Sequence, residues 1–284
     1  FMKALLVGLG VMGKRHLEAM KKNNTIQQIK TVDISVSGAD FKSIDDALRE
    51  QYDIAVVAVP TTYHEEISNK ILDNKIPILL EKPISLNEAS ANRIIKKAKE
   101  NNVKVCIGQI ERFNPAVVKL KEVLEKEKVI SINLYRVGPN PTRILDVDVS
   151  LDLSVHDLDL VEFITGQKIL ASKKIINSTA KHVDYLIKTE DGVSAKLTNS
   201  WMYPFRKRMV SVVTEEKYFE SDLIHKTVDE YNHVDNSTHK KKSIWVDNKD
   251  QLSEQLKYFI DYVKNDTIGS MCIAEEATRI LSWV

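Results

Sequence analysis

The sequence predicts an α/β chain in which a doubly wound parallel sheet is followed by an α+β domain with an open, mainly antiparallel sheet. Over residues 2 to about 110, short apolar runs alternate with amphipathic segments of helical length, as in a parallel sheet covered by helices. The pattern changes at residues 108–115, after which β-type segments follow one another with short turns. Consecutive strands joined in this way form antiparallel sheets. We therefore expect two domains, at residues 1–115 and 116–284.

The composition is that of an ordinary globular protein. The chain has 284 residues, enough for two domains with a core each, and its formal net charge of +1 gives no support for nucleic-acid binding, which needs a basic face. No apolar run approaches the roughly 20 residues of a membrane-spanning helix. The first strand starts at the N-terminus, and Cys106 and Cys272 lack the spacing of metal ligands or of a disulfide framework. We expect a cytoplasmic protein that binds neither membranes nor nucleic acid.

The first predicted element is a strand at residues 4–7, followed directly by Gly8-x-Gly10-x-x-Gly13 and an amphipathic helix. In a dinucleotide-binding turn the first glycine permits the tight turn, the second lets a pyrophosphate approach the backbone, and the third allows close packing of helix on strand. The pyrophosphate binds the unpaired N–H groups at the helix N-terminus. A purely structural turn is the alternative, but the preceding strand and the acidic Asp33, about 20 positions on, favour the dinucleotide. The predicted cofactor contacts here are Gly8, Gly10, Val11, Met12, Gly13 and Asp33.

Asp33 also predicts which dinucleotide is bound. A carboxylate at this position accepts hydrogen bonds from the adenosine ribose and repels a 2′-phosphate. We therefore expect NAD as the cofactor, while the nearby Ser35 leaves room for NADP.

Polar residues follow two further buried strands, at residues 52–59 and 76–80. Ligands of open α/β sheets bind beyond the carboxyl ends of the strands, so these residues are predicted to lie beside the cofactor. They are Pro60, Thr61, His64, Glu81 and Lys82. Lys82 has apolar neighbours and could donate a hydrogen bond to a substrate oxygen. A surface position without a role is the alternative for both Lys82 and His64.

A second group of polar side chains lies in a predicted helix over residues 151–165. Asp152, His156 and Asp159 are spaced i, i+4 and i+7, which puts them on one helical face. A histidine next to a carboxylate is oriented and made more basic, which suits a general base near neutral pH. An ion pair on the helix surface is one alternative. A metal site is another, although no further ligand is evident nearby.

Together these motifs resemble the Gfo/Idh/MocA oxidoreductases, the relatives of glucose–fructose oxidoreductase and inositol dehydrogenase. The resemblance covers nearly all of the chain and rests on Gly8-x-Gly10-x-x-Gly13-x-x-His16, Val59-Pro60 to His64, Glu81-Lys82-Pro83 and Asp152-x-x-x-His156-x-x-Asp159. It implies a Rossmann domain followed by an open antiparallel sheet, through which we expect a homodimer or homotetramer. It also implies that Lys82 hydrogen-bonds the reacting hydroxyl, that His156 is the general base, and that Asp152 completes the polar site.

Narrower motifs resemble the UDP-N-acetylglucosamine 3-dehydrogenases and related nucleotide-sugar enzymes. They are Gly108-Gln109-x-Glu111-Arg112-Phe113-Asn114-Pro115, Arg136-x-Gly138-Pro139 and Ser200-Trp201-x-x-Pro204-x-x-Lys207-Arg208. Arginine forks match phosphate geometry, so a diphosphate or uridine end of the substrate would find partners here. The predicted substrate contacts are Arg112, Asn114, Arg143 and His156, with Lys207 and Arg208 as further candidates. For each basic residue a structural salt bridge is the alternative.

The sequence thus predicts an NAD(P)-dependent oxidoreductase. It would transfer a hydride between nicotinamide and a secondary hydroxyl of a sugar or nucleotide-sugar, such as C3 of a UDP-N-acetylglucosamine-like substrate. A dehydrogenase of free sugars or inositols is an alternative within the same family. A dinucleotide-binding sensor without turnover is an alternative of another class, which the presence of Lys82 and His156 disfavours.

Overall fold

The computed structural model describes residues 1–142, 146–235 and 237–284, and these form two compact units. The first unit contains Phe1–Ile110 together with Asp250–Ser282. The second contains Glu111–Lys249 and the last two residues, Trp283–Val284. None of the helices in these described ranges is both long enough and apolar enough to cross a membrane.

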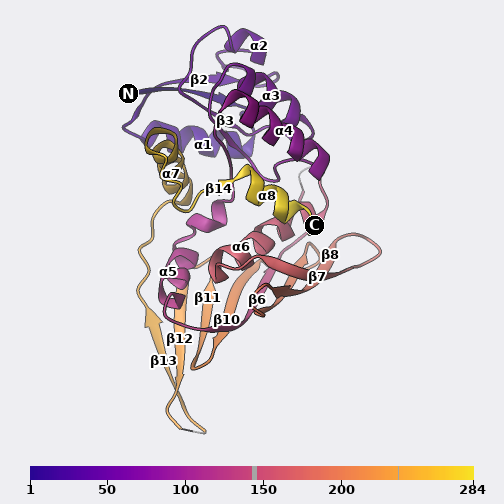
Figure 1. Ribbon diagram of the computed structural model, residues 1–284, viewed down its shortest axis with the longest axis vertical. Coiled ribbons are helices and arrows are strands. Elements are labelled where there is room, and N and C mark those ends of the chain that lie inside the picture. The colour runs from indigo at the N-terminus through magenta and orange to yellow at the C-terminus, as the bar shows by residue number, and fades with distance from the viewer. Residues whose placement is uncertain (143–145, 236) are drawn as a thin grey trace. The chain divides into compact units, whose positions relative to one another are not determined.

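The first unit is built on a six-stranded sheet with the order β14-β5-β4-β3-β1-β2, in which β1 to β5 are parallel (Figure 1). The central strands are continuous apolar runs and are fully buried, as in a parallel sheet covered by helices. The strand order reverses at β1, and the glycine turn follows this strand. Ligands bind at such a switch point. The predicted doubly wound parallel sheet is confirmed. Its elements are β1 (Met2–Val7), α1 (Val11–Lys22), β2 (Ile26–Val32), α2 (Ile44–Ala47), β3 (Ile54–Val57), α3 (His64–Asp73), β4 (Ile78–Leu80), α4 (Glu88–Asn101) and β5 (Val105–Ile107).

The C-terminal segment belongs to the first unit, which corrects the predicted second domain of residues 116–284. This segment contains α7 (Gln251–Asn265), β14 (Cys272–Ile273) and α8 (Ala274–Leu281). β14 pairs antiparallel with β5 and thereby covers an edge that would otherwise be open. α7 packs on α1 and α8 packs on α4 (Figure 1). A two-residue strand carries too little pattern for the sequence to show which sheet it joins.

The second unit is built on an eight-stranded sheet with the order β13-β12-β11-β10-β6-β9-β8-β7. β6 and β9 are parallel and every other pair is antiparallel, which confirms the predicted, mainly antiparallel sheet. α5 (Pro115–Leu124) packs on β11 and β12, and α6 (Val155–Thr165) packs on β6 and β9 (Figure 1). The strands are β6 (Val129–Val137), β7 (Ile169–Ile176), β8 (His182–Thr189), β9 (Ser194–Ser200), β10 (Lys207–Thr214), β11 (Lys217–Asp222), β12 (Thr227–His233) and β13 (His239–Ile244).

Alternation along these strands separates a core face from an open face. In β8, Val183, Tyr185 and Ile187 are buried, whereas Leu186 between the last two is 53% exposed. The last three strands are so polar that composition alone did not reveal them. β13 in particular contains the run Lys240-Lys241-Lys242, and lysines on an edge strand discourage pairing with another chain.

Candidate active site

The glycine turn after β1 is shaped by contacts that only glycine allows. Gly8 has a φ of +95°, and a Cβ on it would lie 2.4 Å from the carbonyl oxygen of Ala58. A Cβ on Gly13 would lie 1.9 Å from the carbonyl oxygen of Gly8. A Cβ on Gly10, by contrast, would meet nothing within 4 Å. Gly8 and Gly13 are therefore required by packing, while Gly10 faces space that a pyrophosphate can enter.

The N-terminus of α1 is prepared for an anion. Gly10 is its N-cap and supplies no side-chain hydrogen bond, and the first turn holds no acidic residue. Val11 next to it is 68% exposed. N–H groups at such a helix end favour phosphate oxygens. The residues present therefore fit the pyrophosphate of a dinucleotide.

Asp33 lies directly beside this turn. Its Oδ2 accepts a hydrogen bond from Leu9 N–H at 2.8 Å, and its Oδ1 accepts from the N–H groups of Ser35 and Val36 at 2.9 and 2.8 Å. Partial burial would raise the pKa of Asp33, but the backbone N–H groups of Val36, Leu9 and Ser35 hold it below its ordinary value. The carboxylate is thus fixed in its ionised form next to the glycine turn, as recognition of a ribose diol requires.

Glu81 and Lys82 follow β4. Glu81 N–H donates to the carbonyl oxygen of Val57 at 2.9 Å, which aligns the segment with the end of β3. Its buried carboxylate lies with Oε1 2.6 Å from Nε2 of His16 on α1. Burial would raise the pKa of Glu81, but the hydrogen bond and charge of His16 and the nearby charge of Lys82 hold it low.

His64 is buried rather than on the surface, so the surface alternative is wrong. Its side chain begins α3 and is 1% exposed. Nδ1 lies 2.9 Å from the carbonyl oxygen of Pro83, and Nε2 lies 3.1 Å from that of Val59. Burial lowers the pKa of His64. The ring thus connects the loop after β3 to the loop after Lys82, and its predicted contact with the cofactor stays a prediction.

Pro60 and Thr61, the other two predicted contacts after β3, lie where that strand gives way to α3. Pro60 is exposed and precedes a short 3₁₀ turn, Thr61–Tyr63, in which Thr61 is buried. The structure thus brings every predicted cofactor contact to the carboxyl end of the parallel sheet.

In the second unit, Asp152 and His156 come from two different kinds of helix. Ser150–Ser154 is a π-helical turn, and α6 continues from Val155. The predicted regular helix is therefore wrong at its start, and the i, i+4 argument for a shared face does not hold for Asp152, because a π turn contains more residues. Both side chains are largely buried, at 9% and 8% exposure. Single π turns inside helices occur frequently at functional sites.

Two predicted substrate contacts have well-defined partners inside the second unit. Arg112 is 6% exposed and binds Asp159 through two hydrogen bonds, Nε to Oδ2 at 2.8 Å and Nη2 to Oδ1 at 2.6 Å. Asn114 donates to Glu111 Oε2 at 3.1 Å and to the carbonyl oxygen of Leu223 at 2.9 Å, and it caps α5. For Arg112 this geometry favours the structural salt bridge. The third candidate, Arg143, lies outside the described residues.

The sequence did not single out a buried charge network beneath α6. Arg136 binds Asp157 through Nε at 2.7 Å and Glu111 through Nη1 at 2.9 Å. Asn199 donates to the other oxygen of Asp157 at 2.6 Å. Burial raises the pKa of Asp157 despite these partners, whereas Arg136 and Arg208 hold that of Glu111 low against its burial. Asp157 follows His156 directly, and that adjacency was the available signal.

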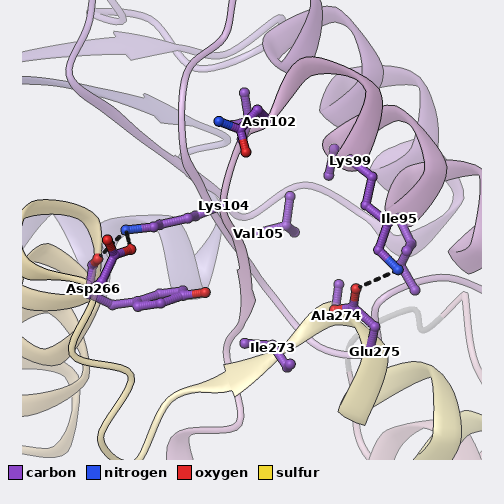
Figure 2. Close-up of a pocket in the computed structure, with 12 residues that line it drawn as sticks. Ile95, Lys99, Asn102, Lys104, Val105, Asp266, Ile273, Ala274 and Glu275 are labelled. Atoms are coloured by element: carbon purple, nitrogen blue, oxygen red, sulfur yellow. Dashed lines mark hydrogen bonds and ion pairs between the residues drawn. The ribbon is translucent and has the colours of Figure 1, made fainter.

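The first unit also contains a cavity of about 570 Å³. Figure 2 shows that it is lined by α4, β5 and the segment after α7, with Lys104 paired to Asp266 and Lys99 to Glu275. None of its lining residues belongs to the predicted site. Within the described part of the chain, no cluster of three His, Cys, Asp or Glu side chains could hold a metal ion.

Residues 2–109 match the model of a family described as "Oxidoreductase family, NAD-binding Rossmann fold", the Gfo/Idh/MocA family. This segment is therefore similar to the NAD-binding domain of the Gfo/Idh/MocA oxidoreductases. The match confirms the predicted resemblance and the predicted NAD-binding oxidoreductase.

Curated relatives extend the similarity into the second unit. A UDP-N-acetylglucosamine 3-dehydrogenase from Acidithiobacillus ferrooxidans is 24% identical over 81% of this chain and 77% of its own length. An inositol 2-dehydrogenase from an Arthrobacter species is 25% identical over 68% of this chain and 65% of its own.

Solved structures share the whole fold. That of the Acidithiobacillus ferrooxidans UDP-N-acetylglucosamine 3-dehydrogenase has a TM-score of 0.90 at 21% identity, covering 99% of this chain and 94% of that one. GenD2 from gentamicin A biosynthesis, in complex with NAD, has a TM-score of 0.83 at 20% identity, covering 99% of this chain and 91% of that one. At these identities the likeness shows the two-domain fold alone.

Proposed function

We propose that this chain is an NAD-dependent dehydrogenase of a secondary hydroxyl on a nucleotide-sugar, of the UDP-N-acetylglucosamine type and at C3. The observation that carries the proposal is the anchored Glu81-Lys82 segment at the mouth of an NAD-binding sheet, in a chain that also has Asp152 in a π turn and His156 in the first turn of α6. The similarity over 81% of the chain to a UDP-N-acetylglucosamine 3-dehydrogenase supports this substrate class.

Each polar residue has one role in this proposal. The nicotinamide of a bound cofactor would be the hydride acceptor. Lys82 donates a charge-assisted hydrogen bond to the substrate oxygen and stabilises the negative charge that develops on it. His156 accepts the hydroxyl proton, and Asp152 keeps its surroundings polar. Asp33 binds the ribose diol and makes NAD the preferred dinucleotide over NADP.

The second candidate is a dehydrogenase of free sugars or inositols. The inositol 2-dehydrogenase relatives favour it, and so does the pairing of Arg112 with Asp159, because that guanidinium then has less capacity for a diphosphate. A turnover screen decides between the two. UDP-N-acetylglucosamine, N-acetylglucosamine, glucose and myo-inositol are each incubated with NAD or NADP, and the nicotinamide absorbance is followed. Activity only on the free polyols would reject the nucleotide-sugar proposal.

We also propose that the open face of the eight-stranded sheet joins two or four copies of the chain. On this face Ile175 and Leu186 are 54% and 53% exposed, and Val213 is 38% exposed. Leu186→Lys places a charge among them and is expected to shift the protein to monomer, since a buried unpaired charge is unfavourable. Sedimentation velocity measures the change, with Leu170→Lys on the outermost strand as the comparison. An unchanged sedimentation coefficient for Leu186→Lys would place the interface elsewhere.

We assign the protein to the cytoplasm. Its cysteines, Cys106 and Cys272, are both free thiols and both buried. Free thiols persist in a reducing compartment.

A further inference from the structure

The carboxylate of Glu81 is enclosed at the point where α1 meets the ends of β4 and β5. Its Oε1 lies 2.6 Å from His16 Nε2, and its Oε2 accepts the backbone N–H of Lys82 at 3.3 Å. A Cβ placed on Gly108, directly after β5, would come within 3.2 Å of Oε1. Each oxygen therefore has a partner, and the close approach of Gly108 leaves the carboxylate little room to move.

Three titratable groups act on this carboxylate. His16 approaches from α1, Lys82 is the next residue, and His64 from α3 interacts with it electrostatically. The side chain of His16 is 2% exposed and that of Glu81 is 10% exposed. Because water screens so little here, the charge of Glu81 acts strongly on whatever lies next to it.

A buried carboxylate beside a lysine attracts its ammonium group. That attraction competes with any hydrogen bond that Lys82 makes to a substrate oxygen. His16 weakens the attraction between Glu81 and the Lys82 ammonium group in two ways. It holds Oε1 of Glu81 toward α1, and its ring lies in contact with the negative charge. His16 also connects the Glu81-Lys82 segment to α1, the helix that begins at the glycine turn, because His16 is the third residue after Gly13 on that helix.

We propose that His16 and Glu81 form a positioning pair, which holds Lys82 in register with the glycine turn and limits how strongly Glu81 attracts its ammonium group. The proposal rests on the proposed function, in which Lys82 contacts the reacting oxygen. Neither His16 nor Glu81 touches the substrate in this scheme. Both act through Lys82.

Competitive labelling tests the pair without any substrate. The intact chain is acetylated with trace reagent over a range of pH, and mass spectrometry of the peptide that contains Lys82 gives the acetylation rate of that one amine. Glu81→Gln removes the negative charge with little change of shape, so we expect Lys82 to be acetylated faster at a given pH. His16→Gln leaves the charge without its partner, so we expect Lys82 to be acetylated more slowly.

A double variant shows whether His16 acts through Glu81. In His16→Gln/Glu81→Gln the charge that His16 offsets is gone, so the effect of His16→Gln on Lys82 should disappear and the value should equal that of Glu81→Gln alone. If His16 served only for packing, His16→Gln would change the labelling of Lys82 by the same amount with Glu81 and with Gln at position 81. The matched control is His182→Gln, which breaks a half-exposed pair with Asp184 in the second unit and should leave Lys82 unchanged.

The possible outcomes are distinct. Opposite shifts in the two single variants, cancelled in the double variant, support the pair. Unchanged labelling of Lys82 in both single variants overturns it, and so does a failure of both to fold, because the pair would then serve the fold as a whole. The proposed function is judged separately, by turnover of Lys82→Ala. The pair can therefore fail while the dehydrogenase stands.

Discussion

Both units place a buried carboxylate next to a residue with a predicted catalytic role, but they neutralise it differently. In the first unit Glu81 precedes Lys82 and contacts His16. In the second unit Asp157 follows His156 and contacts Arg136. A histidine can release its proton near neutral pH, whereas an arginine does not. The first carboxylate is thus paired with an imidazole, and the second with a guanidinium that carries a permanent charge.

The difference matches what each carboxylate lies beside. The first lies beside a lysine, which is predicted to bind an oxygen that gains negative charge. The second lies beside a histidine, which is predicted to accept a proton, and it belongs to a network with Glu111 and Asn199 that fixes the start of α6. Breaking each pair should therefore have different consequences.

The largest expected effect is on turnover. Lys82→Ala and His156→Asn should each lower kcat by about 10²–10⁴-fold, because each removes a group that acts on the reacting hydroxyl. NAD affinity, measured by fluorescence titration, should stay close to that of the wild type. Lys70→Ala, which removes a partly exposed lysine paired with Asp45, is the control and should turn over normally. Full turnover in either test variant would remove that residue from the mechanism.

The next largest effect is on the stability of the second unit. Arg136→Met leaves Asp157 and Glu111 as buried carboxylates without their main partner, and such a loss typically costs about 3–5 kcal/mol. Urea unfolding followed by circular dichroism measures it. Arg93→Met breaks the exposed pair with Glu65 and serves as control, with little change expected. If the two variants unfold at similar urea concentrations, the buried network does not stabilise the unit.

A smaller effect separates two glycines of the same turn. Gly10→Ala has open space around the new methyl group, so the unfolding midpoint should stay the same while NAD affinity falls about tenfold or more, because the methyl enters the space of the pyrophosphate. Gly13→Ala should instead destabilise the first unit, since its Cβ would collide with the backbone of Gly8. Isothermal titration with NAD and thermal unfolding distinguish the two. Unimpaired NAD binding by Gly10→Ala would place the pyrophosphate elsewhere.

The smallest expected effect is on how the stability of the protein depends on pH. The pKa of Glu81 in the folded protein lies below its ordinary value of 4.5, so its stabilising contribution is complete above that value and is lost as the pH falls through the lower, folded value. The unfolding free energy should therefore fall less between about pH 6 and pH 3 in Glu81→Gln than in the wild type. Urea unfolding at several pH values measures this drop. An identical drop in the variant would show that other carboxylates account for the loss.

Local patterns were sufficient for much of this molecule. The buried strands β3 and β4 are continuous apolar runs, and Gly8 and Gly13 after β1 fit a turn whose close contacts leave no room for a side chain. Consecutive β-type segments joined by short turns likewise predicted the mainly antiparallel sheet of the second unit. Such patterns are readable because each depends on neighbours within one element.

Contacts between distant segments were not readable. The segment Asp250–Ser282 returns to the first unit through a two-residue strand, and the partner of Arg112 lies 47 residues away at Asp159. The burial of His64 likewise depends on the carbonyl oxygen of Pro83 from another loop. Apolar periodicity shows that one face of an element is buried, but it does not show which other element packs against that face.

The sequence by itself determined the N-terminal part of the nucleotide-binding unit, from the alternation of strands and helices to the glycine turn and Asp33, because those features follow from local patterns and from the geometry of one turn. Only the tertiary structure decided which charges neutralise one another. His16 with Glu81 and Arg136 with Asp157 are separated by 65 and 21 residues, and a buried charge takes the partner that the fold brings to it. The physical reason is that pairing between charges far apart in the chain depends on how the elements pack, and local sequence patterns do not specify that packing.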